Sequence, residues 1–185
     1  MPKKRILLLL LASHLILCSS SSGISPYAPK GKGLVGPKLG ILGRANVDAG
    51  DETFTSKINV SLGLFFDVPV AGGFYSGIAI DFHNIQVLDQ QQFFLDVSIP
   101  LKFSIPIDRP GIIVKPVVAV GWGHLAGITF MKATDYLTVK GLVELHYLMP
   151  KKRAWVFELG VFDAPVGGNS HTDSSVGPAP FLRVG

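Results

Sequence analysis

The sequence has little charge and almost no cysteine. Only 16% of its 185 residues are charged, and the single cysteine is Cys18. Cys18 lies in a segment that we expect to be removed, so the mature chain has no thiol. This excludes disulfides, a cysteine nucleophile and thiolate metal ligation, and stability must come from packing and hydrogen bonds.

Long hydrophobic runs are also missing after the first 22 residues. The mean hydropathy of +0.41 is high for a soluble domain. However, Lys, Asp, Asn or glycine-rich turns interrupt every candidate for the roughly 20 uncharged apolar residues that a membrane-spanning helix requires. These interruptions argue against a helical membrane protein.

Residues 1–22 have the layout of a cleavable signal peptide. Lys3, Lys4 and Arg5 precede an apolar stretch over 6–17 and a run of small residues over 19–22. Removing three of the 17 basic residues leaves 14 against 13 acidic ones, so the mature chain is nearly neutral. Lipid attachment at Cys18 is an alternative, although Leu17 stands where a lipoprotein signal has a small residue.

We expect a lead-in rich in Gly, Pro and Lys over residues 23–37, followed by one domain over residues 38–185. That domain contains eight segments with period-two hydrophobicity, each bounded by turn-forming residues. The predicted strands are 38–47, 55–68, 74–87, 93–107, 112–128, 136–149, 154–163 and 176–185. No charged residue falls on the apolar face of any of them, and helical spacing is absent. The pattern predicts an all-β, antiparallel fold.

The polar face of these strands is sparse in charge and rich in small residues, such as Gly40, Gly63 and Gly121. A water-facing exterior is usually dense in Lys and Glu, whereas small residues suit the narrow interior of an eight-stranded barrel. Aromatic residues such as Phe74 and Trp155 lie near segment ends, as in the girdles of membrane barrels. The links between strands are tight at the end of the predicted barrel where the chain begins and longer at the opposite end, as in outer-membrane barrels. A soluble barrel has the same alternation and remains an alternative.

The strand count, the opening strand Leu39-Gly40-Ile41-Leu42-Gly43 and the strand over 116–123 resemble the small outer-membrane β-barrel family, which includes OmpA-type and OmpX-type proteins and "porin family" members. The resemblance implies an eight-stranded antiparallel up-and-down transmembrane β-barrel in the outer membrane of a Gram-negative type envelope. Its partners would be outer-membrane lipid and the outer-membrane assembly machinery. Family members usually end in an aromatic residue, whereas this chain ends in Leu182-Arg183-Val184-Gly185.

With the polar face inward, charged and imidazole side chains form a lumen polar network. Its predicted members are Lys38, Arg44, Lys57, Asp81, His83, Asp96, Lys102, Lys115, Lys140, Glu144, His146, Glu158 and Arg183, and Asp67 shares their face. Because buried charges must pair, we expect a structural network that fills the lumen.

Three groups of residues have patterns that also occur in catalytic or metal sites. Asp81 with His83, and Glu144 with His146, place a carboxylate and an imidazole on one face, as a general base or a metal site requires. No matching serine motif accompanies either pair, so we expect structural pairing. Residues 170–173 crowd a flexible loop, where solvation is the expected role.

We therefore expect a structural or surface-interaction module with no enzymatic role, no cofactor and no metal. One alternative is passage of a small solute or hydrophobic compound, because Pro69, Pro100, Pro106 and Pro116 interrupt the strand ladder. Another is a secreted, lipocalin-like ligand-binding barrel. The basic run over 151–153 is too short to predict nucleic-acid binding.

Overall fold

The computed structural model describes residues 33–49, 51–88, 90–107, 111–126, 133–149, 153–169 and 172–185. The predicted signal peptide and the lead-in up to residue 32 lie outside these ranges. All the elements within them are strands. No helix in this part of the chain is long and apolar enough to cross a membrane.

Eleven strands form one sheet. They are β1 (Leu34–Leu42), β2 (Asn46–Ala49), β3 (Glu52–Thr55), β4 (Asn59–Ala71), β5 (Phe74–Val87), β6 (Gln90–Phe103), β7 (Ile105–Pro106), β8 (Ile112–Leu125), β9 (Thr134–Met149), β10 (Arg153–Asn169) and β11 (Thr172–Val184).

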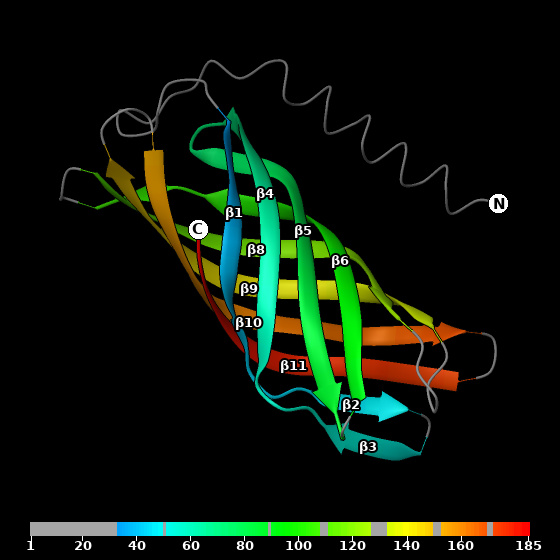
Figure 1. The fold of residues 1–185 in the computed structure, drawn as a ribbon. Helices are drawn as coiled ribbons and strands as arrows, with labels where there is room; N and C mark the ends of the chain where they lie inside the picture. Colours follow the sequence, from blue (N-terminus) through cyan, green and yellow to red (C-terminus); the bar gives the residue numbers. More distant parts are fainter. Residues whose placement is uncertain are drawn as a thin grey trace.

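Eight of these strands close into a ring. The order is β1-β4-β5-β6-β8-β9-β10-β11, every pair is antiparallel, and β1 pairs back with β11 (Figure 1). The closing seam is short: Leu39–Leu42 of β1 face Phe181–Val184 of β11. The short strand β7 pairs with β8, and the β2–β3 hairpin is attached to β11 rather than to the ring strands β4 and β5.

The two ends of the ring differ. We call the end where β1 begins, and where Gly72 and Gly73 turn the chain from β4 into β5, the turn end. Both glycines have positive φ, which residues with a Cβ rarely adopt. We call the opposite end, where the β2–β3 hairpin projects beyond the ring, the hairpin end (Figure 1).

The structure confirms the all-β, antiparallel prediction and the eight strands, but it corrects several boundaries. The first predicted strand ends at Leu42, and the stretch after it, predicted to be partly a link, forms β2 (Asn46–Ala49) and β3 (Glu52–Thr55). Part of the predicted lead-in, from Leu34, is already strand. The predicted loop over 164–175 is mostly strand, because β10 and β11 pair as far as Asn169 and Thr172. The glycine and polar residues of this segment indicated a loop. Pairing between β10 and β11 nevertheless provides the backbone hydrogen bonds of a strand, and this pairing cannot be read from the local sequence.

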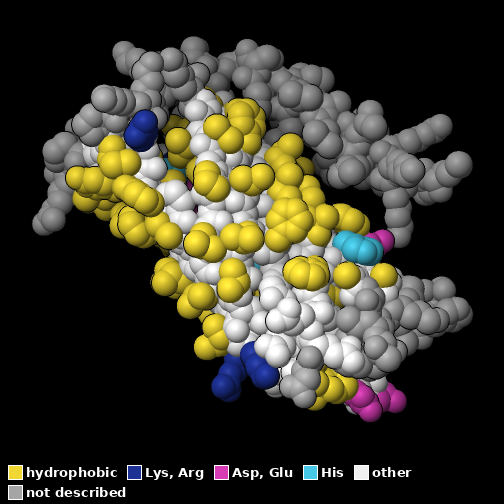
Figure 2. All heavy atoms as spheres, viewed as in Figure 1, with side chains coloured by type: hydrophobic (Ala, Val, Ile, Leu, Met, Phe, Trp, Pro, Cys, Tyr) yellow, Lys and Arg dark blue, Asp and Glu magenta, His cyan; other side chains and the backbone are white. Residues whose placement is uncertain are grey.

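Alternation along each strand gives the ring an apolar outside and a polar inside. On β4, the side chains of Leu62, Leu64 and Phe66 are 51%, 53% and 50% exposed, whereas Ser61 and Asp67 are fully buried. On the face shown in Figure 2, hydrophobic side chains spread over the ring, and charged ones lie near its margins. This arrangement is the reverse of that in a water-soluble protein.

The interior toward the hairpin end is filled by a buried apolar cluster. Phe94 and Phe162 meet edge to face with ring centroids 5.3 Å apart, and Tyr136 lies 5.5 Å from Phe94. Side chains from β1, β2, β5, β8 and β11 complete it, including Leu42, Val47, Ile85, Leu125 and Phe181. The inside of the ring therefore has an apolar half at the hairpin end and a charged half toward the turn end.

The close approach of β1 and β11 at their seam requires a glycine at position 40, which can be tested. A Cβ at this position would overlap the Leu182 carbonyl and the Arg183 backbone, whereas one at Gly141 would meet nothing. Because the backbone of β11 would have to move, Gly40→Ala is expected to lower the free energy of unfolding by about 1–3 kcal/mol. Urea unfolding in detergent micelles measures this change.

Gly141→Ala is the matched control, since it adds the same methyl group in open space on the outer face. It is expected to leave stability unchanged or raise it by about 0.5–1 kcal/mol. Equal destabilisation by both substitutions would contradict the close approach of β1 to β11.

Candidate functional site

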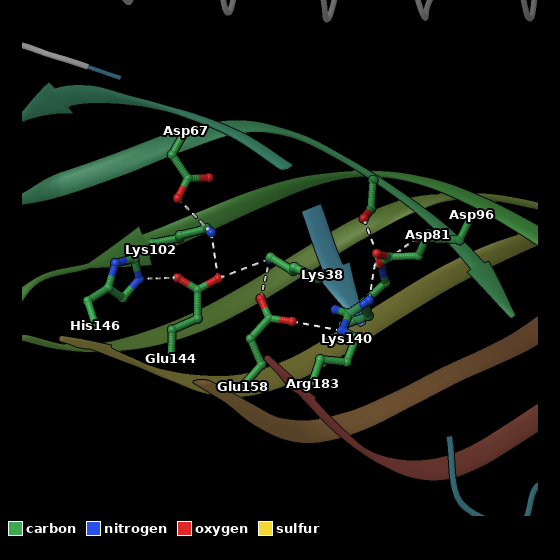
Figure 3. A network of polar contacts seen from close by, with 11 residues as sticks. Lys38, Asp67, Asp81, Asp96, Lys102, Lys140, Glu144, His146, Glu158 and Arg183 are labelled. Atoms are coloured by element: carbon green, nitrogen blue, oxygen red, sulfur yellow. Dashed lines mark hydrogen bonds and ion pairs between the residues drawn. The ribbon is translucent and has the colours of Figure 1, made fainter. Parts of the chain in front are cut away.

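Eleven of the thirteen predicted network residues are buried inside the ring. They come from seven of its eight strands, and Asp67 on β4 adds the eighth. The eleven are Lys38, Asp81, His83, Asp96, Lys102, Lys115, Lys140, Glu144, His146, Glu158 and Arg183, each at most 5% exposed. Figure 3 shows how most of them converge on one another.

The placement of Arg44 and Lys57 was wrong, because both side chains are exposed. Arg44 follows the end of β1, and Lys57 precedes the start of β4, so both lie in stretches that are not strand. Side chains alternate between two faces only while the backbone is extended and pleated. Because the predicted alternation was extended beyond the ends of the strands, it assigned both residues to the inner face.

The group nearest the turn end is centred on Glu144. Its Oε1 lies 2.6 Å from Lys102 Nζ and 3.5 Å from Lys38 Nζ, and its Oε2 lies 2.8 Å from His146 Nε2. Lys102 Nζ also pairs with Asp67 Oδ2 at 2.8 Å. Glu144 on β9 thus connects to β6 and β1 through ion pairs with Lys102 and Lys38 (Figure 3).

The deeper group is centred on Asp81. Lys140 Nζ pairs with Asp81 and lies 2.5 Å from Asp96 Oδ2, and Arg183 Nη1 lies 2.5 Å from Asp81 Oδ1. Arg183 Nε also donates to Glu158 Oε2 at 2.7 Å. Because Glu158 pairs with Lys38 as well, it joins the two groups and links strands on both sides of the β1–β11 seam.

The charges of the interior balance. Five cations (Lys38, Lys102, Lys115, Lys140 and Arg183) accompany five carboxylates (Asp67, Asp81, Asp96, Glu144 and Glu158). Two cations also lie over the Phe65 ring, with Lys38 Nζ 4.3 Å from its centroid. A buried charge is tolerated only when it is paired and hydrogen bonded. The paired charges therefore suit a structural role, in which they stabilise one particular strand register.

The two carboxylate–imidazole pairs differ. Glu144 and His146 are hydrogen bonded, whereas neither ring nitrogen of His83 has a hydrogen-bond partner among the described residues. His83 packs instead on Phe162, with ring centroids 5.0 Å apart. It lies where the charged half of the interior meets the apolar half.

Ser61 is a neighbour of His83 that sequence reasoning missed. The two are cross-strand partners on β4 and β5 and both point inward, but no hydrogen bond joins them. Only the strand register reveals this neighbour. A serine nucleophile needs a base within hydrogen-bond reach and an approach for substrate, and both residues are at most 2% exposed. Ser61 and His83 therefore do not form a hydrogen-bonded nucleophile–base pair.

Within the described residues, no group of three or more His, Cys, Asp and Glu side chains is placed to hold a metal ion. The residue cluster over 170–173 falls outside the side chains that the structure describes.

At the hairpin end, Asp48 fastens the β2–β3 hairpin to the ring. Ser175 Oγ on β11 donates to Asp48 Oδ2 at 2.6 Å, and Thr53 Oγ1 on β3 donates to Asp48 Oδ1 at 2.7 Å. These hydrogen bonds to the carboxylate lower the pKa of Asp48, the one from Ser175 most. The chain thus builds an extension of β10, β11, β2 and β3 beyond the ring.

Comparison of the chain with protein-family models, curated proteins and solved structures finds no match.

Proposed function

We propose that the chain is an integral outer-membrane β-barrel protein with a structural or surface-interaction role and no enzymatic role. The observation that carries this proposal is the apolar outer face, which continues around the whole ring. Each ring strand contributes at least one large apolar side chain that is about half exposed or more: Leu39, Leu62, Phe74, Leu101, Val120, Val143, Leu159 and Leu182. In water such a continuous surface would drive aggregation, whereas lipid is a favourable surrounding for it.

Aromatic side chains on the outer face support the same proposal. At the turn end, the Phe74 and Phe103 rings lie 4.8 Å apart, and Tyr147 is the cross-strand partner of Trp155. At the hairpin end, Phe93 is 64% exposed. Ten residues separate Phe93 from Phe103 along β6, which is about 34 Å of strand. At the usual strand tilt this spans roughly 24–28 Å, close to the height of a membrane barrel's apolar band.

The interior favours a closed scaffold over a transport path. An eight-stranded ring leaves little room beyond its own side chains, and here ion pairs occupy one half and aromatic and aliphatic side chains the other. A lipocalin-like function would need an apolar cavity inside a water-facing wall. The charged interior and the apolar exterior oppose that alternative.

In the proposed orientation the hairpin end faces the outside of the cell. The extension of β10, β11, β2 and β3 would then stand above the membrane. This extension is the part of the chain best suited to a surface interaction.

Cell fractionation tests the proposal. The full chain is expected in outer membranes after an alkaline carbonate wash, and it should migrate differently on gels with and without boiling. Planar-bilayer recordings should show no conductance. Recovery as a freely soluble periplasmic protein would overturn the membrane proposal, and steady single-channel conductance would overturn the closed scaffold.

A further inference from the structure

Lys115 differs from the other buried cations of the ring. Lys38, Lys102, Lys140 and Arg183 each pair with a carboxylate, but no described carboxylate lies within 4.0 Å of Lys115 Nζ. That atom lies instead 4.0 Å from the centroid of the Tyr75 ring. An ammonium group has three N–H donors, and burying it without acceptors is costly. The side chain as a whole is only 4% exposed.

Ser104 is the neighbour of Lys115 on the adjacent strand. Lys102 pairs with Val117 and Ile105 with Val114, and both registers place Ser104 opposite Lys115. Its amide donates to the Gly73 carbonyl at 2.8 Å, which fixes it at the turn end. Its hydroxyl lies near Tyr75 but meets hydrogen-bond geometry with no described group, although the residue is only 5% exposed.

We infer that Lys115, Ser104 and Tyr75 form a binding site for a single phosphate group at the turn end of the ring. The three side chains come from β8, β6 and β5 and together offer one positive charge and five N–H or O–H donors. A phosphate group has enough oxygens, tetrahedrally arranged, to accept from several directions at once. A carboxylate accepts mainly in one plane.

The carboxylates near this site pair with other cations. Glu144 and Asp67 both pair with Lys102, and Glu144 also pairs with His146 and Lys38. Lys38 pairs more closely with Glu158 than with Glu144. The nearby carboxylates are thus paired with Lys38, Lys102 and Arg183, and none of them pairs with Lys115. A phosphate site is not part of the proposed function and does not depend on it. Binding requires only that the ring is folded, whether in a membrane or in detergent.

Calorimetric titration of inorganic phosphate tests the site. The full chain would be folded in maltoside micelles, which contain no phosphate, with heat-dependent gel migration as the check on folding. Saturable binding is expected for the wild type. Lys115→Met should weaken it about ten- to hundredfold, as expected for loss of a charged hydrogen-bond donor. Ser104→Ala should weaken it several-fold and provides a second variant if Lys115→Met does not fold.

Arg153→Met is the matched control, because Arg153 is an exposed cation at the same end of the ring. It should bind as the wild type does. A parallel titration with phosphatidylglycerol identifies the source of the phosphate group: binding of this lipid alone, lost in Lys115→Met, would indicate a headgroup. No binding of either probe to the folded wild type would overturn the site, as would equal binding by wild type and Lys115→Met. Because binding is measured in micelles, this result is separate from that of cell fractionation.

Discussion

Replacing Leu62 with arginine is expected to remove most of the protein from washed outer membranes. Leu62 is the fourth residue of β4, is 51% exposed, and has outward-facing neighbours in Leu39 and Phe82. If this surface faces lipid, an arginine there costs about 2–4 kcal/mol, which shifts the folding equilibrium roughly 30- to 1,000-fold. Fractionation, and urea unfolding in lipid vesicles, measure the effect.

A position outside the apolar band provides the control. Glu52→Arg places the same side chain on β3, in the extension beyond the ring, where the side chain is already exposed and charged. It is expected to assemble normally. Val120→Arg, on the outer face of β8, should repeat the Leu62→Arg defect. Normal insertion of both outer-face variants would contradict a lipid-facing surface and favour a water-soluble ring.

Replacing Glu144 with alanine is expected to destabilise the ring by about 3–5 kcal/mol, the usual cost of leaving buried charges without their partner. Glu144 is the carboxylate shared by Lys102, Lys38 and His146. Its loss leaves Lys102 with Asp67 alone and removes the hydrogen bond of His146. Urea unfolding in micelles, followed by heat-dependent gel migration, measures the change.

Lys115→Met is the comparison for this prediction. Lys115 is the cross-strand partner of Glu144 and is equally buried, but no described carboxylate pairs with it. Because its removal leaves no carboxylate without a partner, we expect a change of less than about 1 kcal/mol, measured without phosphate. If Glu144→Ala and Lys115→Met lowered the free energy of unfolding by similar amounts, burial rather than ion pairing would determine how much each side chain contributes to stability.

The strands and their two faces can be predicted from the amino-acid sequence alone. Leu62, Leu64 and Phe66 share one face of β4, and Ser61 and Asp67 share the other, as the period-two pattern predicts. Alternation is a local property of an extended backbone, so it can be read without knowing which strands pair. The same pattern placed eleven of the thirteen network residues inside. It failed at Arg44 and Lys57, because the strands end before these residues.

Which buried charges form pairs depends on the tertiary structure. Lys38 and Glu158 are 120 residues apart in the chain, and Arg183 reaches Asp81 from across the ring. These contacts depend on strand register and on closure of β1 against β11, which no local pattern encodes. The β2–β3 hairpin likewise exists because β11 extends far enough to pair with it. The lack of an ion pair at Lys115 has the same origin: every inward lysine looks alike in the sequence, and the partner of each depends on which strands lie across the ring.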